Sequence, residues 1–179
     1  MKRLTTFLAI FLFAFALQGQ TVLTYQGGTS LMDAGKGTFD SGTESWAALG
    51  TNTIENDDGA LKITYDSNME GAYIQLRSIR DIDRDLTVGK IYKVRARAKI
   101  NAGAANLAVY TSGFNLSSAL TTNYEWHEII FTATSTNANS LKLRNFGATE
   151  IVWIDEWYIQ EWYPDGRVLM YDGKVLIYE

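Results

Sequence analysis

One carboxylate in this sequence sits where a carboxylate is costly. Asp155 lies between Trp153 and Trp157 in the run Ile151–Ile159, whose β-branched and aromatic residues predict a central strand. Alternate residues of a strand share a face, so these three side chains are predicted to point the same way, toward the core. Burying an ionised carboxylate is unfavourable unless hydrogen bonds or a cation compensate. Asp155 is therefore interpreted either as a residue that caps a loop near the strand end or as a metal ligand.

A second candidate site is a ligand-binding surface on the polar faces of three predicted strands. Aromatic rings stack on sugar rings, and planar polar groups bond sugar hydroxyls. If the strands are neighbours in one sheet, they build one surface from Tyr73, Gln75, Arg77, Arg95, Arg97 and Tyr110. The arginines would suit carboxylated sugars by bidentate pairing. The alternatives are a solvated strand face and a binding site on a loop rim at Phe114, Asn115 and Tyr124.

Catalytic chemistry has little support in the sequence. His127 is the single histidine, and the chain has no cysteine, which excludes a Cys–His pair and a zinc cluster. Glycoside hydrolysis needs two carboxylates at a set separation, but no spacing among the 20 acidic residues singles out a pair. No phosphate-binding glycine motif is present. We expect no catalytic residues and a protein that is not an enzyme.

The first twenty residues have the pattern of a secretory signal peptide. Lys2 and Arg3 precede the apolar run Phe7–Leu17, and Ala14–Ala16 offers a small-residue cleavage pattern, with cleavage nearer Gln20 as the alternative. Eleven apolar residues are too few to span a bilayer as a stable helix. The mature protein is therefore predicted to be secreted, extracellular or periplasmic, with no membrane span.

Composition limits the class of protein further. The chain of 179 residues is 46% hydrophobic and 20% charged, which is typical of one globular domain. Loss of Lys2 and Arg3 changes the net charge from −4 to −6, because −4 − 2 = −6. Such an acidic chain is a poor nonspecific nucleic-acid binder. An exported chain without disulfides must depend on its hydrophobic core.

The elements that position the candidate residues are short strands. The clearest is Ile91–Ile100, in which five apolar residues alternate with four cations. Other strands are predicted at Thr21–Tyr25, Ala60–Tyr65, Ala72–Ile79, Asn106–Thr111, Tyr124–Ala133 and Ser140–Arg144. About eight strands between Thr43 and Trp162, with no helical periodicity, predict an all-β fold: an antiparallel β-sandwich of the jelly-roll type. Its core is predicted to contain Trp46, Trp126, Trp153 and Trp157.

The C-terminal end differs from the rest of the chain. Arg167–Tyr171 and Lys174–Glu179 flank Asp172-Gly173, the signal for a tight β-hairpin. A lone hairpin is marginally stable in water, so it is expected either to dock on the domain or to contact a protein partner. The predicted organisation is a signal peptide (1–20), a connector (21–36), a jelly-roll domain (37–162) and a hairpin tail (163–179).

Three pieces of the chain together resemble the CenC-like group of carbohydrate-binding modules (the CBM4/9/22 type), the jelly-roll modules of bacterial glycanases. The similarity covers about residues 37–160. The pieces are Gly37-Thr38-Phe39-Asp40 with Gly42 to Trp46; Asp58-Gly59-Ala60-Leu61-Lys62-Ile63 with Leu86 to Val94; and Glu125-Trp126 with Phe131-Thr132 and Ile154-Asp155-Glu156. Lys36 and Asp40 stand where the group usually has Asn and Glu.

The resemblance implies both a metal and a function. In that group a structural calcium commonly joins the N-terminal segment to the last strand, and the matching side chains here are Asp40 and Asp155, with backbone oxygens near Gly37 or Gly59. The implied function is that of a secreted, non-catalytic module that binds a poly- or oligosaccharide on a concave sheet face. The alternative is a structural or adhesive component of a cell surface, secreted assembly or phage particle that uses the sandwich as a scaffold.

Overall fold

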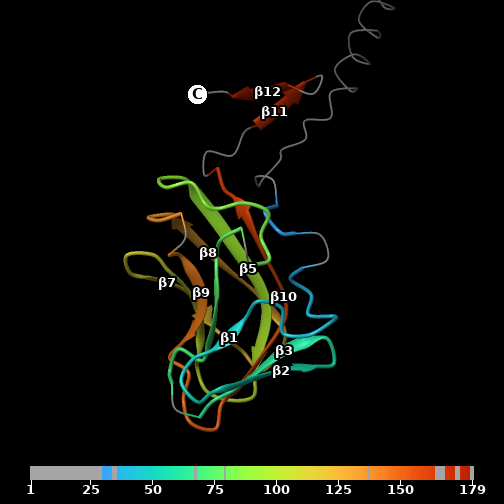
Figure 1. Cartoon of the computed structure of the whole chain (residues 1–179), viewed down its shortest axis with the longest axis vertical. Helices are drawn as coiled ribbons and strands as arrows, with labels where there is room; N and C mark the ends of the chain where they lie inside the picture. The colour runs from blue at the N-terminus through green and yellow to red at the C-terminus, as the bar shows by residue number, and fades with distance from the viewer. Residues whose placement is uncertain are drawn as a thin grey trace, which may run out of the picture. The chain divides into compact units, whose positions relative to one another are not determined.

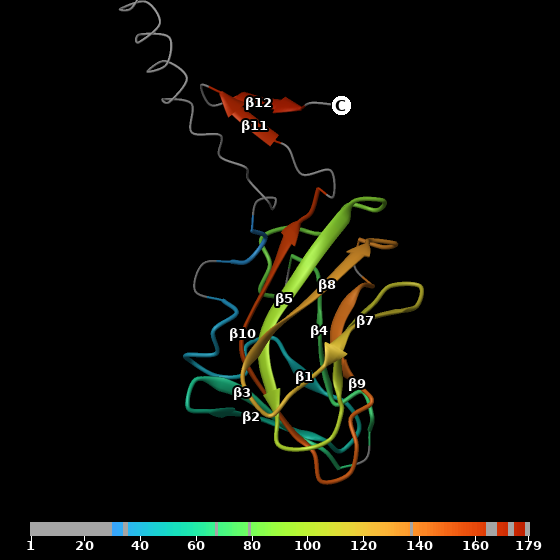
Figure 2. The same ribbon diagram turned by 180° about the vertical axis from the view of Figure 1, so that it is seen from behind.

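Two five-stranded antiparallel sheets form the body of the protein. The computed structural model describes residues 30–33, 36–66, 68–78, 80–136 and 138–163, and the backbone of residues 168–171 and 174–177. The first sheet has the strand order β1 (Ala47–Ala48), β4 (Ala72–Gln75), β9 (Ser140–Arg144), β6 (Asn106–Tyr110) and β7 (Phe114–Ala119). The second has the order β2 (Thr53–Asp57), β3 (Ala60–Thr64), β10 (Ile151–Glu161), β5 (Ile91–Ile100) and β8 (Glu125–Thr132). Figures 1 and 2 show the two layers from opposite sides.

The predicted all-β sandwich is confirmed. Strands β5 and β9 have the predicted bounds, and no described residue forms a helix. The described part of the chain accordingly offers no helix long and apolar enough to cross a membrane. One predicted strand is shorter than expected. The strand predicted at Ala72–Ile79 ends at Gln75, because Arg77 N donates to Gln75 O and the chain turns there.

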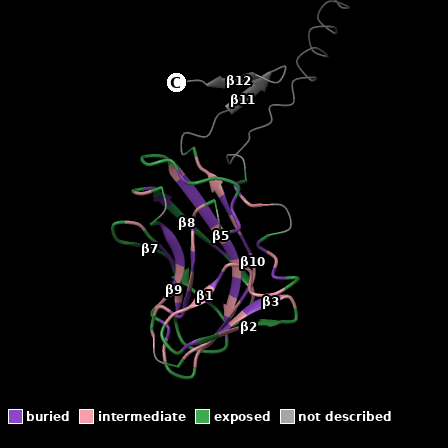
Figure 3. Ribbon diagram, in the orientation of Figure 1, coloured by how far each residue is buried: buried purple, intermediate pink, exposed green. Residues whose placement is uncertain are grey.

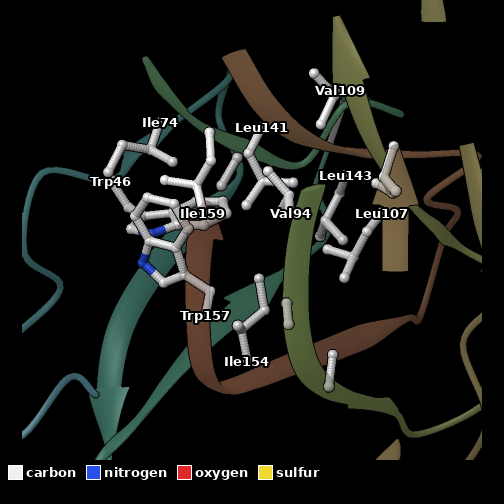
Figure 4. Packing of buried hydrophobic residues seen from close by; sticks show 14 of the residues in the cluster. Trp46, Ile74, Val94, Leu107, Val109, Leu141, Leu143, Ile154, Trp157 and Ile159 are labelled. Carbon is white, nitrogen blue, oxygen red and sulfur yellow. The ribbon is translucent and has the colours of Figure 1, made fainter. Parts of the chain in front are cut away.

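The hydrophobic core lies between the two sheets. The interior strands direct apolar side chains inward, so Leu107 and Leu143 of the first sheet face Val94 and Ile154 of the second (Figure 4). All four are at most 1% exposed. Figure 3 shows long buried stretches along strands such as β5 and β9. This fixes which side chains of each strand remain on the outer faces.

Strand β10 contains a β-bulge that the sequence pattern does not predict. In its pairing with β5, Ile154 is opposite Ala98 and Glu156 is opposite Arg97, so Asp155 has no residue opposite it. The extra residue reverses the alternation. Val152 and Ile154 are buried before the bulge, and Trp157 and Ile159 are buried after it. The prediction that Trp153, Asp155 and Trp157 share a face is therefore wrong: Trp153 and Asp155 are partly exposed, whereas Trp157 is buried.

The segment before β1 packs on β10. Trp157 N donates to Gly37 O (2.9 Å), and Leu31 N donates to Ile159 O (2.9 Å). The ring of Trp46 packs edge-on against Trp157 at 6.2 Å between centroids, and Phe39 lies 6.5 Å from Trp46. Leu31, within the predicted connector, is fully buried. These contacts tie the N-terminal segment to a central strand of the second sheet.

The C-terminal hairpin forms as predicted in its backbone. Strand β11 (Val168–Tyr171) pairs antiparallel with β12 (Lys174–Ile177), and Tyr171 is opposite Lys174. The Asp172-Gly173 turn, the predicted strand Thr21–Tyr25 and the predicted signal peptide lie outside the described residues.

Candidate functional site

The candidate site lies on the outer face of the first sheet, where three strands run side by side. Tyr73 of β4 is opposite Lys142 of β9, and Lys142 is opposite Ala108 of β6. One step along the strands, Gln75 is opposite Ser140, which is opposite Tyr110. The residues between them, among them Ile74 and Leu141, point into the core (Figure 4). The two cross-strand rows therefore place aromatic, amide, hydroxyl and ammonium groups on one surface.

A pocket of about 230 Å³ opens among these rows. Two of the residues that line it, Ala138 and Ser140, are small, and Ser140 lies between Gln75 and Tyr110 in the sheet. It is lined by Leu49, Tyr73, Gln75, Tyr110, Ala138, Ser140 and Lys142. The tyrosine rings and the amide of this pocket match what a sugar requires. The rings can stack on its apolar face, and the amide can form hydrogen bonds with its hydroxyls.

Aromatic rings and cations continue the surface toward β7. The rings of Tyr110 and Phe114 lie 5.1 Å apart, and each is 37% exposed. Lys142 Nζ lies 5.2 Å from the centre of the Tyr110 ring, and the guanidinium of Arg144 lies 4.0 Å from that of Phe114. Both geometries are within the range of cation–π attraction. The rings are thus held in place while part of their surface stays open to a ligand.

Glu70 bridges the two cations of this surface. Its Oε2 lies 2.8 Å from Lys142 Nζ, and its Oε1 lies 2.9 Å from Arg144 Nη1. The three charged side chains are each between 17% and 28% exposed. One carboxylate thus orients two cations at the edge of the pocket.

The structure brings together three of the six predicted ligand-binding residues. Tyr73, Gln75 and Tyr110 line the pocket, because β4 and β6 both pair with β9. Arg77 lies beyond the end of β4 and does not line the pocket. Arg95 and Arg97 lie on β5 in the second sheet, so the prediction of one surface containing all six residues is wrong. The loop-rim candidate is also divided: Phe114 and Asn115 are on β7, whereas Tyr124 contacts Arg97 and Lys99 of β5.

The outer face of the second sheet is a ladder of cations and aromatic rings. Arg95 lies 4.8 Å from the Trp126 ring, and Lys99 lies 4.9 Å from the Trp153 ring. Trp126 is 40% exposed, and Trp153 donates from Nε1 to Asp57 Oδ2. The prediction that both tryptophans fill the core is therefore wrong, while Trp46 and Trp157 are buried as predicted.

The predicted calcium ligands come from two turns joined by Asn56 and from the bulge in β10: Asn56 Nδ2 donates to Phe39 O and Gly42 O on either side of Asp40, and Asn56 Oδ1 accepts from Gly59 N. Asp40 is exposed in a turn and accepts a hydrogen bond from Thr38 Oγ1 (2.8 Å). Gly59 lies in the turn between β2 and β3. Asp155, at the bulge, forms an ion pair with Arg97 Nη1. Among the described residues, no three histidine, aspartate or glutamate side chains cluster closely enough to hold a metal ion. The ion pair with Arg97 partly compensates the charge of the Asp155 carboxylate, which lies on a partly exposed face.

His127 is a buried residue of β8 rather than a surface residue. It is 3% exposed, and its Nδ1 lies 3.1 Å from Ser118 Oγ. Burial lowers the pKa of His127 below its ordinary value near 6.5, and the charge of Glu125 partly opposes this. The folded protein therefore binds a proton at His127 less readily than the unfolded chain does.

We expect the free energy of unfolding to fall as the pH drops below about 6.5. In that range the unfolded chain takes up a proton that the folded protein resists, so the slope from this residue reaches at most about 1.4 kcal/mol per pH unit. Urea unfolding between pH 7.5 and 5.0 measures it. His127→Gln should flatten this part of the profile, and an unchanged profile in that variant would contradict the assignment.

Several site residues were missed from the sequence. Ser140, Lys142 and Arg144 lie in a correctly predicted strand, and their alternation with Leu141 and Leu143 marked them as its polar face. That face was not assigned a function, because no local pattern shows that β9 lies between β4 and β6. Glu70 sits in a turn, where its pairing with two cations on β9 has no sequence signal.

Comparisons with known proteins identify the fold. No protein-family model matches the chain, and no curated protein matches its sequence. Among solved structures, the CBM22-1 xylan-binding domain of Paenibacillus barcinonensis Xyn10C matches with a TM-score of 0.56 at 15% identity, covering 76% of this chain and 96% of that one. The CBM1 module of BiXyn10A in its apo form matches with a TM-score of 0.54 at 17% identity, covering 76% and 99%.

A third match comes from a larger enzyme. It is the CBM22-1–GH10 portion of Clostridium thermocellum endo-1,4-beta-D-xylanase 10B in complex with xylohexaose, with a TM-score of 0.55 at 16% identity, covering 76% of this chain and 29% of that one. The chain therefore has the jelly-roll fold of these carbohydrate-binding modules, as the resemblance implies.

Proposed function

We propose that this protein is a carbohydrate-binding module that binds a poly- or oligosaccharide on the outer face of the first sheet and performs no chemistry itself. The observation that carries the proposal is the pocket, in which Tyr73 of β4 and Tyr110 of β6 lie on either side of β9, which contributes Ser140 and Lys142, and Gln75 lies opposite Ser140. The shared fold supports it, because the solved structures that it resembles include the CBM1 module of BiXyn10A and a CBM22-1 xylan-binding domain.

Tyr110→Ala is expected to weaken glycan binding by at least about tenfold, because it removes a stacking ring at the centre of the surface. A glycan array of the chain identifies a ligand, and titration calorimetry with that ligand compares the variants. Trp126→Ala is the matched control, since Trp126 is a similarly exposed ring on the other sheet. Equal loss in both variants would contradict the location of the site, and loss only in Trp126→Ala would move it to the second sheet.

Secretion belongs to the same proposal. Cleavage of the first twenty residues would release an acidic domain outside the cytoplasm, where polysaccharides are accessible. Mass spectrometry of the protein recovered from the medium or periplasm of an expressing cell would locate the cleavage site. Recovery of the uncleaved chain inside the cell would contradict secretion.

Calcium is proposed as a structural ion held by Asp40, Asp155 and a backbone oxygen near Gly59. The proposal is supported by the contact between the N-terminal segment and β10, where Trp157 N meets Gly37 O. We expect calcium to raise the melting temperature by mass action, and Asp155→Ala to lower that temperature and abolish the calcium response. Arg97→Gln is the control, because it breaks the same ion pair but keeps the carboxylate. The same melting temperature in calcium and in chelator would contradict the proposed structural calcium.

The scaffold role remains the alternative function. The paired strands β11 and β12 supply the observation that favours it, since among the described residues they pair only with each other, and an edge strand can pair with a strand of another chain. Gel filtration of the chain with and without residues 163–179 would distinguish the scaffold role from the carbohydrate-binding role. Loss of a defined oligomer on truncation, with no glycan bound on the array, would favour the scaffold role.

A further inference from the structure

The pocket carries a charge opposite to that of the chain. Of its seven lining residues, Lys142 is the only charged one, and none is a carboxylate. The chain as a whole has a net charge of −4. A local cation in an acidic protein attracts and orients anionic ligands, whereas a neutral ligand gains nothing from it.

The neighbouring charges leave this cation incompletely neutralised. Lys142 and Arg144 share the single carboxylate of Glu70, so the triad has a net charge of +1, from two cations and one anion. Both cations also lie against aromatic rings, Tyr110 and Phe114, which form the sugar-stacking surface. The Lys142 side chain is only 17% exposed, and partial removal from water strengthens its interaction with a charged group.

From this geometry we infer that the pocket prefers an acidic glycan, one that carries a uronic acid carboxylate, over its neutral counterpart. The inference rests on the proposed function and names the substrate class for the same site. A sugar ring stacked on Tyr110 has hydroxyl partners in Gln75 and Ser140. A carboxylate on that ring or on its neighbour reaches the ammonium of Lys142, with Arg144 on the same strand face two residues further along.

The test uses pairs of ligands that differ only in charge. The probes are oligosaccharides from glucuronoxylan and from polygalacturonate, each compared by calorimetry with its carboxyl-reduced form on the whole chain. We expect the acidic member of at least one pair to bind about tenfold more tightly at low salt, since hydrogen bonds to charged groups are the stronger ones. That advantage should shrink in 0.5 M salt while binding of the reduced form stays constant, because ions screen the charge.

Three variants assign the preference to its residues. Lys142→Met keeps the side-chain stem and should bind both members of a pair equally. Glu70→Gln releases both cations and should tighten binding of the acidic member about threefold, with the neutral member unchanged. Lys99→Met, the same change of charge on the second sheet, is the control and should leave the preference intact.

The outcomes separate this inference from the proposed function. Equal affinity for both members of every bound pair, or a preference that survives in Lys142→Met, overturns the acidic-glycan assignment while glycan binding stands. Absence of binding to every probe in the panel and to the glycan array overturns the proposed function, and the inference with it. Loss of both members in Tyr110→Ala supports the shared site.

Discussion

Trp157→Ala is expected to lower the free energy of unfolding by about 3–5 kcal/mol, the usual cost of deleting a large aromatic side chain from a core. Trp157 is 1% exposed and is the largest fully buried side chain among the described residues. Its ring packs against Trp46, which in turn packs against Phe39. The substitution therefore leaves a cavity where the N-terminal segment meets β10, and that segment cannot collapse into it without breaking its own contacts.

Urea denaturation measures the loss, and Trp153→Ala is the matched control. Trp153 is the same residue type four positions earlier on the same strand, but the bulge at Asp155 places it on the outer face. Trp153→Ala removes one hydrogen bond to Asp57 and a contact with Lys99, so we expect it to lower the free energy of unfolding by about 1 kcal/mol or less. Similar costs for the two tryptophans would show that both are buried and would contradict the bulge.

The bulge also marks where sequence reasoning failed in β10. A run of β-branched and aromatic residues was enough to predict the strand itself, because such residues suit a pleated, buried position. Its faces were assigned by strict alternation, and one extra residue at Asp155 reverses that alternation. No feature of the run Ile151–Ile159 distinguishes a bulged strand from a regular one. The bulge is visible only in the pairing with β5.

The three strands that were not predicted are all edge strands, although a fourth edge strand, β8, was predicted because its apolar residues alternate. β1 and β7 are the edges of the first sheet, and β2 is an edge of the second. An edge strand pairs on one side only and covers little of the core, so it needs no apolar alternation; β2 is Thr-Ile-Glu-Asn-Asp, and four of its five residues are exposed. The interior strands β5 and β9 must bury one face, and both were predicted at their observed bounds.

The candidate site was predictable in its parts but not in its assembly. Tyr73, Gln75 and Tyr110 were identified because aromatic rings can stack on sugar rings and planar polar groups can bond their hydroxyls. Arg95 and Arg97 had the same local pattern, yet β5 belongs to the other sheet. Which strands become neighbours depends on crossovers between strands that are distant in the sequence, here β4, β9 and β6. Periodicity within one strand contains no information about them.

Gly37→Ala is expected to destabilise the protein by about 3–4 kcal/mol, for two separable reasons. The residue has φ +89°, a conformation that costs an L-residue about 1–2 kcal/mol. A Cβ at Gly37 would also lie 2.3 Å from the carbonyl oxygen of Trp157, which is backbone of the central strand and cannot move aside freely. Relieving this clash breaks the hydrogen bond from Trp157 N to Gly37 O and separates the N-terminal segment from β10.

Gly89→Ala separates the two costs of Gly37→Ala. Gly89 has nearly the same φ, +86°, but a Cβ there meets no atom within 4 Å, so only the conformational cost of about 1–2 kcal/mol applies. Denaturant midpoints of the two variants give the contribution of the close approach as their difference. The extra loss in Gly37→Ala should appear together with a change in tryptophan fluorescence, because Trp157 and Trp46 lie at this contact. Equal destabilisation by the two substitutions would mean that the segment around Gly37 is not packed against β10.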